Sequence, residues 1–389
     1  MVKTPVYLDY NATTPCDERV VEVMLPFFNR RFGNPASHNH IFGWEADESV
    51  KYAREQVATL IAADPTEIVF TSGATEANNL ALKGIFETYA GKGNHIITCG
   101  IEHKAVLDAC SHLERLGAEV TYLDVNERGQ IDLNKLEKSF KETTILVAIM
   151  YANNEIGTIR PVKEISAIAK SRGVLFFTDA TQAVGKIPVN VSEDGIDLMA
   201  FSAHKLYGPK GIGALYVRRK GPRVKLAAQI DGGGHERGMR SGTLNVPAIA
   251  GFGKACEICT EEIGAESVRI GDFRDELERA LLTLENSYVN GDREHRLPNV
   301  SNIRFEGSDS ETLMRELSRD IAVSSGSACM SASLEPSYVL KALGLTDEMA
   351  RSSLRFSLGR YTTAEEIQFA VKQFKAAATR LRGMRSTIE

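Results

Sequence analysis

The residues best placed to do chemistry surround a lysine, Lys205. It follows Ser202 and His204 at the end of an apolar run, and the glycine-punctuated turn Gly208–Gly213 leads into a second apolar run. This pattern predicts a strand, a loop and a strand, with the lysine at the mouth of the loop. A lysine that loses solvent there can act as a nucleophilic amine, and the hydroxyl and imidazole beside it suit a phosphate. An amine next to phosphate donors is what pyridoxal phosphate needs, and a surface lysine in a glycine loop is the alternative.

Two other segments also follow predicted strands. Thr71–Asn78 opens a helix with small residues whose free N–H groups suit an anion, and Thr75 adds a hydroxyl. Asp179 ends the strand Val174–Thr178, where a carboxylate can pair with a protonated pyridine nitrogen, and Gln182 could reach the same ring. A helix cap explains either segment without a ligand.

His103 comes just after the predicted strand His95–Cys99. Histidine transfers protons near neutral pH and its ring can stack on a flat cofactor, although a lone histidine is often structural. The eight histidines show no metal-ligand spacing, so we expect no resident metal.

Cys329 lies in the stretch 324–333, which is rich in serine, glycine and alanine. We expect an accessible thiol there, as a nucleophile that must travel requires, and an incidental thiol is the alternative. Cys256 and Cys259 form a C-x-x-C pair inside the helical pattern Val246–Ile263, which favours a core or surface role over redox or metal chemistry.

Composition narrows the functional class. The chain has 389 residues, of which 43% are hydrophobic and 25% charged, which is typical of a globular protein. The formal net charge of -5 gives no electrostatic case for direct contact with nucleic acid or an anionic membrane. The cysteines are scattered, and the sequence shows no signal peptide. No apolar run approaches the ~20 residues of a membrane span. We therefore expect a cytoplasmic protein.

Helical and strand patterns alternate from about residue 45 to 260, which predicts a mostly parallel sheet covered on both faces. The predicted strands are Glu67–Thr71, His95–Cys99, Glu119–Leu123, Thr144–Met150, Val174–Thr178, Asp197–Phe201 and Ala214–Val217. Beyond residue 260 the helical patterns Glu266–Leu284 and Thr363–Leu381 dominate, with short strands between them. We therefore predict an α/β protein with a large domain, 16–260, and a small α+β domain, 1–15 and 261–389, carrying the cysteine loop 324–337.

Together these motifs resemble the pyridoxal-phosphate enzymes of aminotransferase class V, and within them the group I cysteine desulfurases of the NifS/IscS family. The cysteine loop Ser324–Cys329 is the most specific motif for group I. The resemblance covers nearly the whole chain, through Tyr7–Thr14, Phe32–Pro35, Ala152–Gly157, Gly232–Thr243 and Arg355–Arg360. It implies a type I pyridoxal-phosphate fold with a mostly parallel, seven-stranded type of sheet.

The resemblance also implies roles around the cofactor. The residue matching Lys205 forms the Schiff base, that matching Asp179 binds the pyridine nitrogen, and that matching Gln182 binds the phenolic oxygen. His103 matches the stacking histidine. Thr243 matches a ligand from the other subunit, which implies a homodimer. The remaining cofactor-binding positions are Ala74, Thr75, Asn154, Ser202 and His204.

For the reaction, the resemblance implies conversion of L-cysteine to L-alanine. Arg355 and Asn154 match substrate-binding residues, and an arginine fork suits a carboxylate. Cys329 matches the nucleophile that takes the sulfur as a persulfide, where a transferred iron–sulfur cluster could also be contacted. The implied acceptors are an iron–sulfur scaffold protein and other carriers, with tRNA thiolation as a further use.

Alternatives within the class are a selenocysteine lyase or another class V enzyme, and outside it a catalytically idle scaffold. Housekeeping members often extend beyond the point where this sequence stops, in a tail that helps to dock the scaffold protein, so the docking mode stays open.

Overall fold

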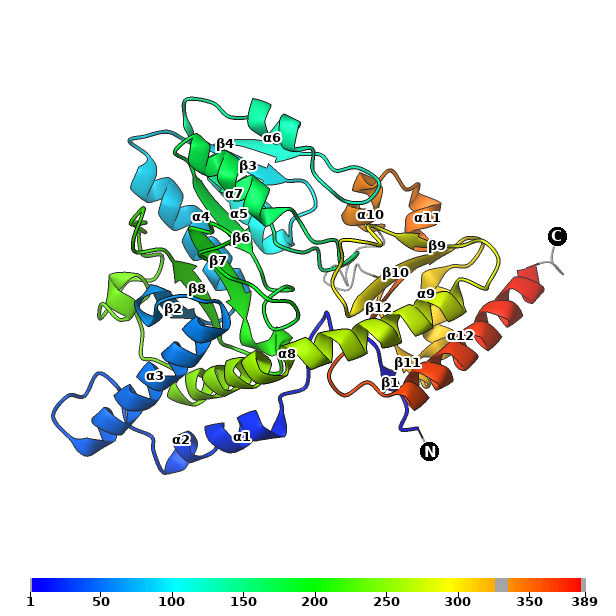
Figure 1. Ribbon diagram of the computed structural model, residues 1–389, viewed down its shortest axis with the longest axis horizontal. Coiled ribbons are helices and arrows are strands. Elements are labelled where there is room, and N and C mark those ends of the chain that lie inside the picture. Colours follow the sequence, from blue (N-terminus) through cyan, green and yellow to red (C-terminus); the bar gives the residue numbers. More distant parts are fainter. Residues whose placement is uncertain (1, 326–334, 386–389) are drawn as a thin grey trace.

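The computed structural model describes residues 2–325 and 335–385. Its centre is a seven-stranded sheet with the strand order β2-β8-β7-β6-β5-β3-β4 (Figure 1). Strand β8 runs antiparallel to both of its neighbours and the remaining pairs are parallel, which confirms the predicted mostly parallel α/β sheet. The strands are β2 (Ile68–Thr71), β3 (His95–Cys99), β4 (Glu119–Leu123), β5 (Thr144–Ala148), β6 (Leu175–Asp179), β7 (Leu198–Ser202) and β8 (Gly213–Val217).

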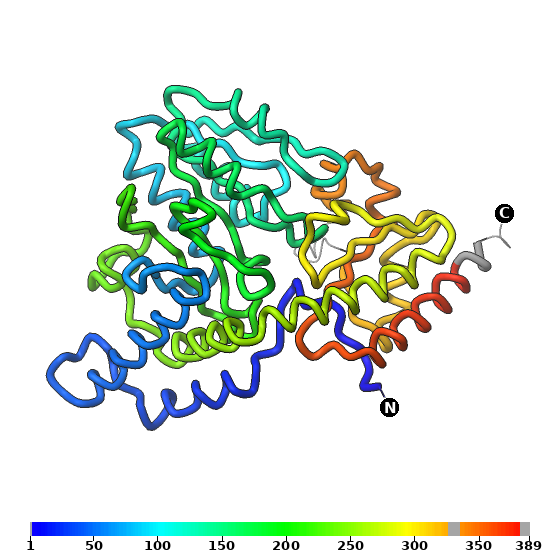
Figure 2. Tube along the Cα trace, viewed as in Figure 1, coloured from blue at the N-terminus to red at the C-terminus, as the bar shows by residue number. Residues whose placement is uncertain are grey.

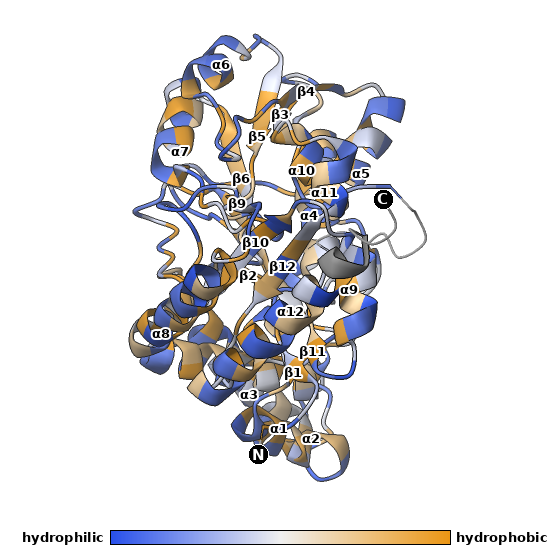
Figure 3. Ribbon diagram, turned by 90° about the vertical axis from the view of Figure 1, so that its right-hand side faces the viewer, coloured by the Kyte–Doolittle hydropathy of each residue, from blue (hydrophilic) through white to orange (hydrophobic). Residues whose placement is uncertain are grey.

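Helices cover both faces of this sheet. Successive side chains of a strand point to opposite faces, so Ile96 packs in one hydrophobic core and Ile97 in the other. Figure 3 shows the apolar colouring along β3 and β5 that such double burial requires. One face carries α4 (Ala74–Tyr89) and α5 (Lys104–Arg115), and the other carries α1 (Glu18–Met24), α3 (Ile41–Leu60), α7 (Val162–Ser171) and the first half of α8.

A second, smaller part holds a three-stranded antiparallel sheet of order β12-β10-β9 and a parallel pair, β1 with β11. Its strands are β1 (Val6–Tyr7), β9 (Ser287–Asn290), β10 (Val300–Phe305), β11 (Ile321–Ala322) and β12 (Ser353–Ser357). Its helices are α9 (Ser310–Leu317), α10 (Tyr338–Ala342), α11 (Asp347–Arg351) and α12 (Ala364–Arg385). Figure 2 shows the N-terminal segment starting in this part and running to the centre of the molecule.

Helix α8 (Val246–Leu281) joins the two parts as one continuous helix of 36 residues. The sequence predicted two helices here, and that prediction was wrong, because Gly264 interrupts the pattern but costs a helix only about 1 kcal/mol. Phe252 packs in the core of the large part and Leu277 in that of the small part. The division at residues 260 and 261 therefore falls inside a helix and stays a proposal.

The shorter helices α2 (Pro26–Asn29) and α6 (Leu133–Lys138) lie at the periphery of the large part, as Figure 1 shows. Within the described ranges, we find no helix with the length and apolar content that crossing a membrane demands. The carboxyl ends of β3, β5, β6 and β7 meet at one edge of the sheet, where ligands of such folds bind.

Candidate active site

A cavity of about 610 Å³ opens at this edge of the sheet. It brings together all the predicted site residues except Thr243 and Cys329. Thr243 is exposed and does not line the cavity, and Cys329 lies outside the described residues. The predicted residues that line it are Ala74, Thr75, His103, Asn154, Asp179, Gln182, Ser202, His204, Lys205 and Arg355.

Lys205 ends a single 3-10 turn, Ala203–Lys205, directly after β7. Its Nζ donates hydrogen bonds to the carbonyl oxygens of Asn11 at 2.5 Å and Ala12 at 2.6 Å. These two bonds hold the amine in the cavity, at the carboxyl end of the sheet, as the position of a nucleophilic lysine requires.

His204 lies next to the amine, and its Nδ1 is 3.1 Å from Thr13 Oγ1. Burial, together with the nearby charges of Lys205 and Lys210, lowers the pKa of His204 to about 4. The imidazole is therefore neutral at pH 7, and it can offer a phosphate one N–H donor without a charge.

Helix α4 begins beside this lysine turn, and two glycines allow the close approach. Gly73 is the N-cap, with φ of 155°, and a Cβ on Gly213 would lie 2.7 Å from Gly73 Cα. The first turn of α4, including Thr75, therefore faces the same cavity as Ser202. Backbone N–H groups at a helix start have no partner within the helix and favour an anion.

Asp179 is the last residue of β6 and is 5% exposed. Its Oδ1 accepts from the backbone N–H of Thr181 at 2.9 Å, and its Oδ2 accepts from Asn78 Nδ2 at 2.7 Å. Two donors thus fix the carboxylate, which still has lone pairs for a third partner in the cavity.

His103 is the N-cap of α5, and its Nδ1 accepts from the backbone N–H of Ala105 at 3.1 Å. An acceptor nitrogen carries no proton, so this bond assigns the proton of the neutral ring to Nε2. The structure therefore keeps one tautomer of His103 at the cavity wall.

Arg355 on β12 reaches the cavity from the small part and is 4% exposed. Its Nη2 pairs with Asp9 Oδ1 at 2.7 Å, and its Nη1 donates to the carbonyl of Asn154 at 3.0 Å. Arg355 Nε and Asn154 Oδ1 are buried and lack a hydrogen-bond partner among the described residues. Such groups are costly unless a ligand or water satisfies them.

The sequence did not point to several polar residues that the structure places in or beside the cavity: Asn11, Asn78, Glu102, Glu155 and Lys186. Burial raises the pKa of Glu102 to about 8 and that of Glu155 to about 7. Glu102 directly precedes His103, and Glu155 Oε2 accepts from Ser337 Oγ at 2.5 Å. Asn11, Asn78 and Glu155 lie inside quoted motifs and Glu102 directly precedes His103, whereas Lys186 had no such signal.

The donor set fits pyridoxal phosphate. The cavity offers an amine at Lys205, an anion site at the start of α4, a carboxylate at Asp179 and a cation at Arg355. The buried Oδ1 of Asn154, which has no partner among the described residues, is also suited to a polar ligand.

The C-x-x-C pair lies within α8, where Cys256 is 0% and Cys259 is 1% exposed. Burial raises the pKa of Cys256 and also that of Cys259, to about 12. Such inert, protonated thiols have the core role that the helical pattern favoured. In the described part of the chain, no three His, Cys, Asp or Glu side chains are grouped to hold a metal ion.

Comparison with known proteins agrees with this site. The model of the family described as aminotransferase class-V matches residues 6–369. The protein named cysteine desulfurase IscS from Histophilus somni (strain 129Pt) is 58% identical over 385 residues, which cover 98% of this chain and 95% of the relative. The chain belongs to the cysteine desulfurase family within aminotransferase class V.

Solved structures of the family superpose closely on the chain. A NifS-like protein has a TM-score of 0.90 at 40% identity, covering 97% of this chain and all of its own. A structure titled SspA in complex with cysteine has a TM-score of 0.80 at 37% identity, covering 92% of this chain and 99% of its own. Enzymes of this family depend on pyridoxal phosphate, and the predicted family and fold are confirmed.

Proposed function

We propose that this protein is a cysteine desulfurase that converts L-cysteine to L-alanine and holds the sulfur as a persulfide on Cys329. One observation carries the proposal: the amine of Lys205, the anion site of α4, Asp179 and Arg355 surround a single cavity. The family membership of the chain and the cysteine complex of its structural neighbour support L-cysteine as the substrate.

When bound, pyridoxal phosphate would supply an electron sink that stabilises negative charge at the substrate α-carbon. Lys205 would carry the cofactor and move the α-proton. Asp179 would keep the ring nitrogen protonated, and Gln182 would bind the ring oxygen. The phosphate would be held by Ala74, Thr75, Ser202 and His204.

Arg355 would bind the substrate carboxylate together with Asn154. Asp9 already occupies one nitrogen of the guanidinium, and this ion pair fixes the side chain before the substrate arrives. Arg355 Nε has no partner among the described residues, so it is the nitrogen that would gain most from the substrate. His103 would donate a hydrogen bond from Nε2, the nitrogen that its helix-capping bond leaves protonated, and it would accept a proton only if Nδ1 gave up that capping bond.

In the sulfur-transfer step, one bond of the substrate breaks and one bond to Cys329 forms. The carbon–sulfur bond of the substrate breaks, its sulfur forms a sulfur–sulfur bond with the Cys329 thiolate, and the carbon skeleton takes up protons and leaves as alanine. Cys329 lies outside the described residues, but both described flanks of its segment bond a residue that lines the cavity or is adjacent in sequence to one that does. Ser324 pairs by its backbone with Arg355, and Ser337 bonds Glu155.

A homodimer would complete the site through Thr243, which is exposed and does not line the cavity of its own chain. The loop that carries it is anchored by Glu236, whose carboxylate accepts from Arg54 at 2.6 Å and from the backbone N–H of Phe70 at 2.8 Å. Arg54 lies on α3. Large apolar side chains are exposed at the start of α3 and in and around α2, at Leu25, Phe28, Phe32, Ile41, Phe42 and Trp44. We call these six residues the apolar patch, and such patches mark protein interfaces.

The persulfide would pass to a scaffold protein for iron–sulfur cluster assembly and to other sulfur acceptors, including those of tRNA thiolation. We further propose the cytoplasm as the site of action. No direct contact with nucleic acid is needed for this role.

The test is turnover by the purified holoenzyme with L-cysteine and a thiol reductant, measuring alanine and sulfide together. We expect equal amounts of both, and Lys205→Ala should lower the rate at least ~1000-fold and remove the visible band of the lysine-bound cofactor. Alanine from selenocysteine with none from cysteine would instead identify a selenocysteine lyase. A pure protein that takes up no cofactor would contradict both activities.

A further inference from the structure

Asn11 lies at the centre of the hydrogen bonds beneath the cavity, although the sequence gave it no role. It is 1% exposed, and its backbone carbonyl accepts from Lys205 Nζ at 2.5 Å and from Gln182 Nε2 at 3.1 Å. Its side-chain Oδ1 accepts from Lys186 Nζ at 3.0 Å and from Asn299 Nδ2 at 2.9 Å. Asn11 thus contacts both the Lys205 amine and the Gln182 side-chain amide of the cofactor site.

The second member of this arrangement is Lys186. Its Nζ donates to Asn11 Oδ1 and to Gln182 Oε1, so it joins two acceptors that otherwise face the interior. Burial and the nearby Lys205 and Arg355 hold the pKa of Lys186 well below its usual value. A lysine amine in the interior has a cost, and bonds to two amide oxygens offset part of it.

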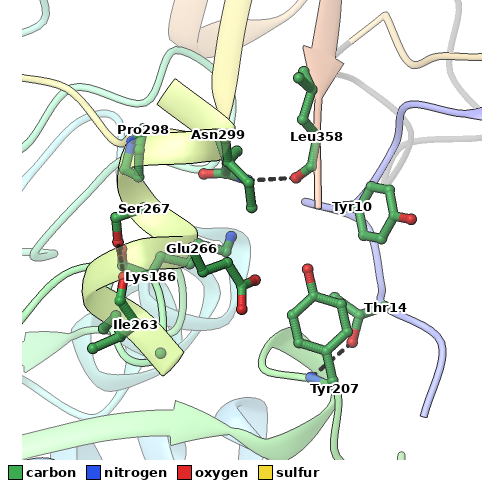
Figure 4. Close-up of a pocket in the computed structure, with 12 residues that line it drawn as sticks. Tyr10, Thr14, Lys186, Tyr207, Ile263, Glu266, Ser267, Pro298, Asn299 and Leu358 are labelled. Atoms are coloured by element: carbon green, nitrogen blue, oxygen red, sulfur yellow. Dashed lines mark hydrogen bonds between the residues drawn. The ribbon is translucent and has the colours of Figure 1, made fainter. Parts of the chain in front are cut away.

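The backbone of Lys186 is fixed as well. Ser267 Oγ on α8 donates to the Lys186 carbonyl at 2.9 Å, as Figure 4 shows. The same view places Asn299 and Leu358 of the small part across a small cavity from Lys186, with Asn299 bonded to the Leu358 carbonyl. Lys186 therefore stands at the junction of the two parts, directly behind the cofactor site.

A second arm of Asn11 runs to the substrate residues. Asn11 Nδ2 donates to the carbonyl of Asn154 at 3.0 Å, and the same carbonyl accepts from Arg355 Nη1 at 3.0 Å. The backbone N–H of Asn11 donates to Ser357 Oγ on β12 at 2.9 Å, two residues from Arg355. The amide side chain of Asn11 thus bonds toward the cofactor with its oxygen and toward the substrate site with its nitrogen.

We infer that Asn11 and Lys186 are a pair of positioning residues: Lys186 fixes Gln182 and the cofactor side, and the Asn11 amide nitrogen fixes Asn154 and Arg355. The inference deepens the proposed function and rests on it for the identity of the cofactor and the substrate. Lys186 has no bond to the reacting amine, and Asn11 bonds it through its backbone carbonyl alone, so both side chains act through their hydrogen-bonded neighbours.

The inference is testable by two variants, of which one should weaken cofactor binding and the other should weaken substrate binding. Lys186→Met keeps the length of the side chain but removes the donor that orients Gln182. We expect the dissociation constant of pyridoxal phosphate to rise about tenfold, as the loss of one buried hydrogen bond would produce. The pH midpoint of the visible cofactor band should move by about half a unit or more, whereas KM for L-cysteine should change less than about threefold.

Asn11→Asp keeps the oxygen that accepts from Lys186 but cannot donate to the Asn154 carbonyl. We expect KM for L-cysteine to rise about tenfold while the dissociation constant of pyridoxal phosphate stays within about twofold. Lys170→Met, at an exposed lysine on α7, is the matched control and should change none of these quantities. Should Lys186→Met fail to fold, Lys186→Leu also removes the donor and should raise the dissociation constant of pyridoxal phosphate in the same direction.

Equal losses in cofactor affinity and KM in both variants would reveal a merely structural role and overturn the inference. So would an unchanged cofactor affinity and visible band in Lys186→Met. Turnover of the wild-type protein is measured in parallel, so a failure of the proposed activity is seen there. Cofactor binding in the variants still decides the Lys186 arm in that case.

Discussion

The side-chain amide of Asn78 donates a 2.7 Å hydrogen bond to Asp179 Oδ2 in the buried interior. This bond connects the second turn of α4 with the carboxyl end of β6. Because α4 provides the anion site at its start, the bond sets the separation between that site and the Asp179 carboxylate. A cofactor with a phosphate at one end and a basic nitrogen at the other must match this separation.

Replacing Asp179 by asparagine keeps the size of the side chain and removes its charge. We expect alanine production to fall at least ~100-fold, which corresponds to roughly 2.7 kcal/mol of barrier, because the ring nitrogen would lose its ionic partner. Steady-state alanine formation by the holoenzyme measures this. Asn78→Ala, which leaves the charge and removes only its orienting donor, should cost less, and near-native rates in Asp179→Asn would assign Asp179 a structural role.

Cys329→Ser should retain the cofactor spectrum and bind L-cysteine, yet release almost no sulfide, because a hydroxyl cannot accept the sulfur. Mass spectrometry of the wild-type protein after exposure to L-cysteine should find the added sulfur on the peptide that contains Cys329. Cys16→Ser is the matched control and should keep near-native sulfide release. Full release by Cys329→Ser, or sulfur mainly on Cys256 or Cys259, would contradict the proposed mechanism.

Glu102 should make stability depend on pH. Burial raises its pKa to about 8, so the folded protein holds a proton that the unfolded chain loses near 4.5. The stability that the neutral form contributes is therefore complete below pH 4.5 and declines as the pH rises to about 8, by up to about 4 kcal/mol.

Glu102→Gln keeps a neutral side chain at every pH. Urea unfolding at pH 5, 6.5 and 8 should show the variant gaining on the wild-type protein as the pH rises. Glu155, whose pKa is also raised, is present in both proteins, so its own pH dependence cancels in the difference. Glu142→Gln at an exposed position should track the wild type, and a Glu102→Gln difference that stays constant with pH would show that Glu102 titrates normally.

The apolar patch should hold the proposed dimer together. Phe28 is 64% exposed, and Phe28→Asp would place a charge in a surface that excludes water in a dimer. We expect the dimer dissociation constant to rise at least tenfold by analytical ultracentrifugation, with weaker cofactor binding because Thr243 of the second copy leaves the site. Val268→Asp, on an isolated exposed residue of α8, should leave both unchanged, and a Phe28→Asp protein that dimerises normally would place the interface elsewhere.

The periodic segments of this fold could be predicted from the sequence with close bounds. Strands β3 and β4 begin and end where the pattern of apolar residues predicted. The two-residue strand β1 and the short helix α6 are absent from the prediction, because so few residues establish no period. The sequence predicted two helices in place of α8, because a glycine indicates a helix end when the packing on either side of it is unknown.

The predicted site residues share a simple property, since most of them follow a strand directly and parallel strands end at one edge. Asn11 and Lys186 could not be found in this way. The bonds of Asn11 reach Asn154, Lys205 and Ser357, which lie 143 to 346 positions away in the chain. Such contacts depend on the assembled fold, and a single sequence carries no signal for them.

Helix α8 also affects how the protein unfolds. At 1.5 Å per residue its 36 residues extend about 54 Å. One end of the helix packs in the core of the large part and the other end in the core of the small part. Loss of packing at either end would fray the helix toward the other, so the two parts are expected to melt in one cooperative transition. Separate expression of the two parts would divide the helix and leave an apolar stripe of each half open to water.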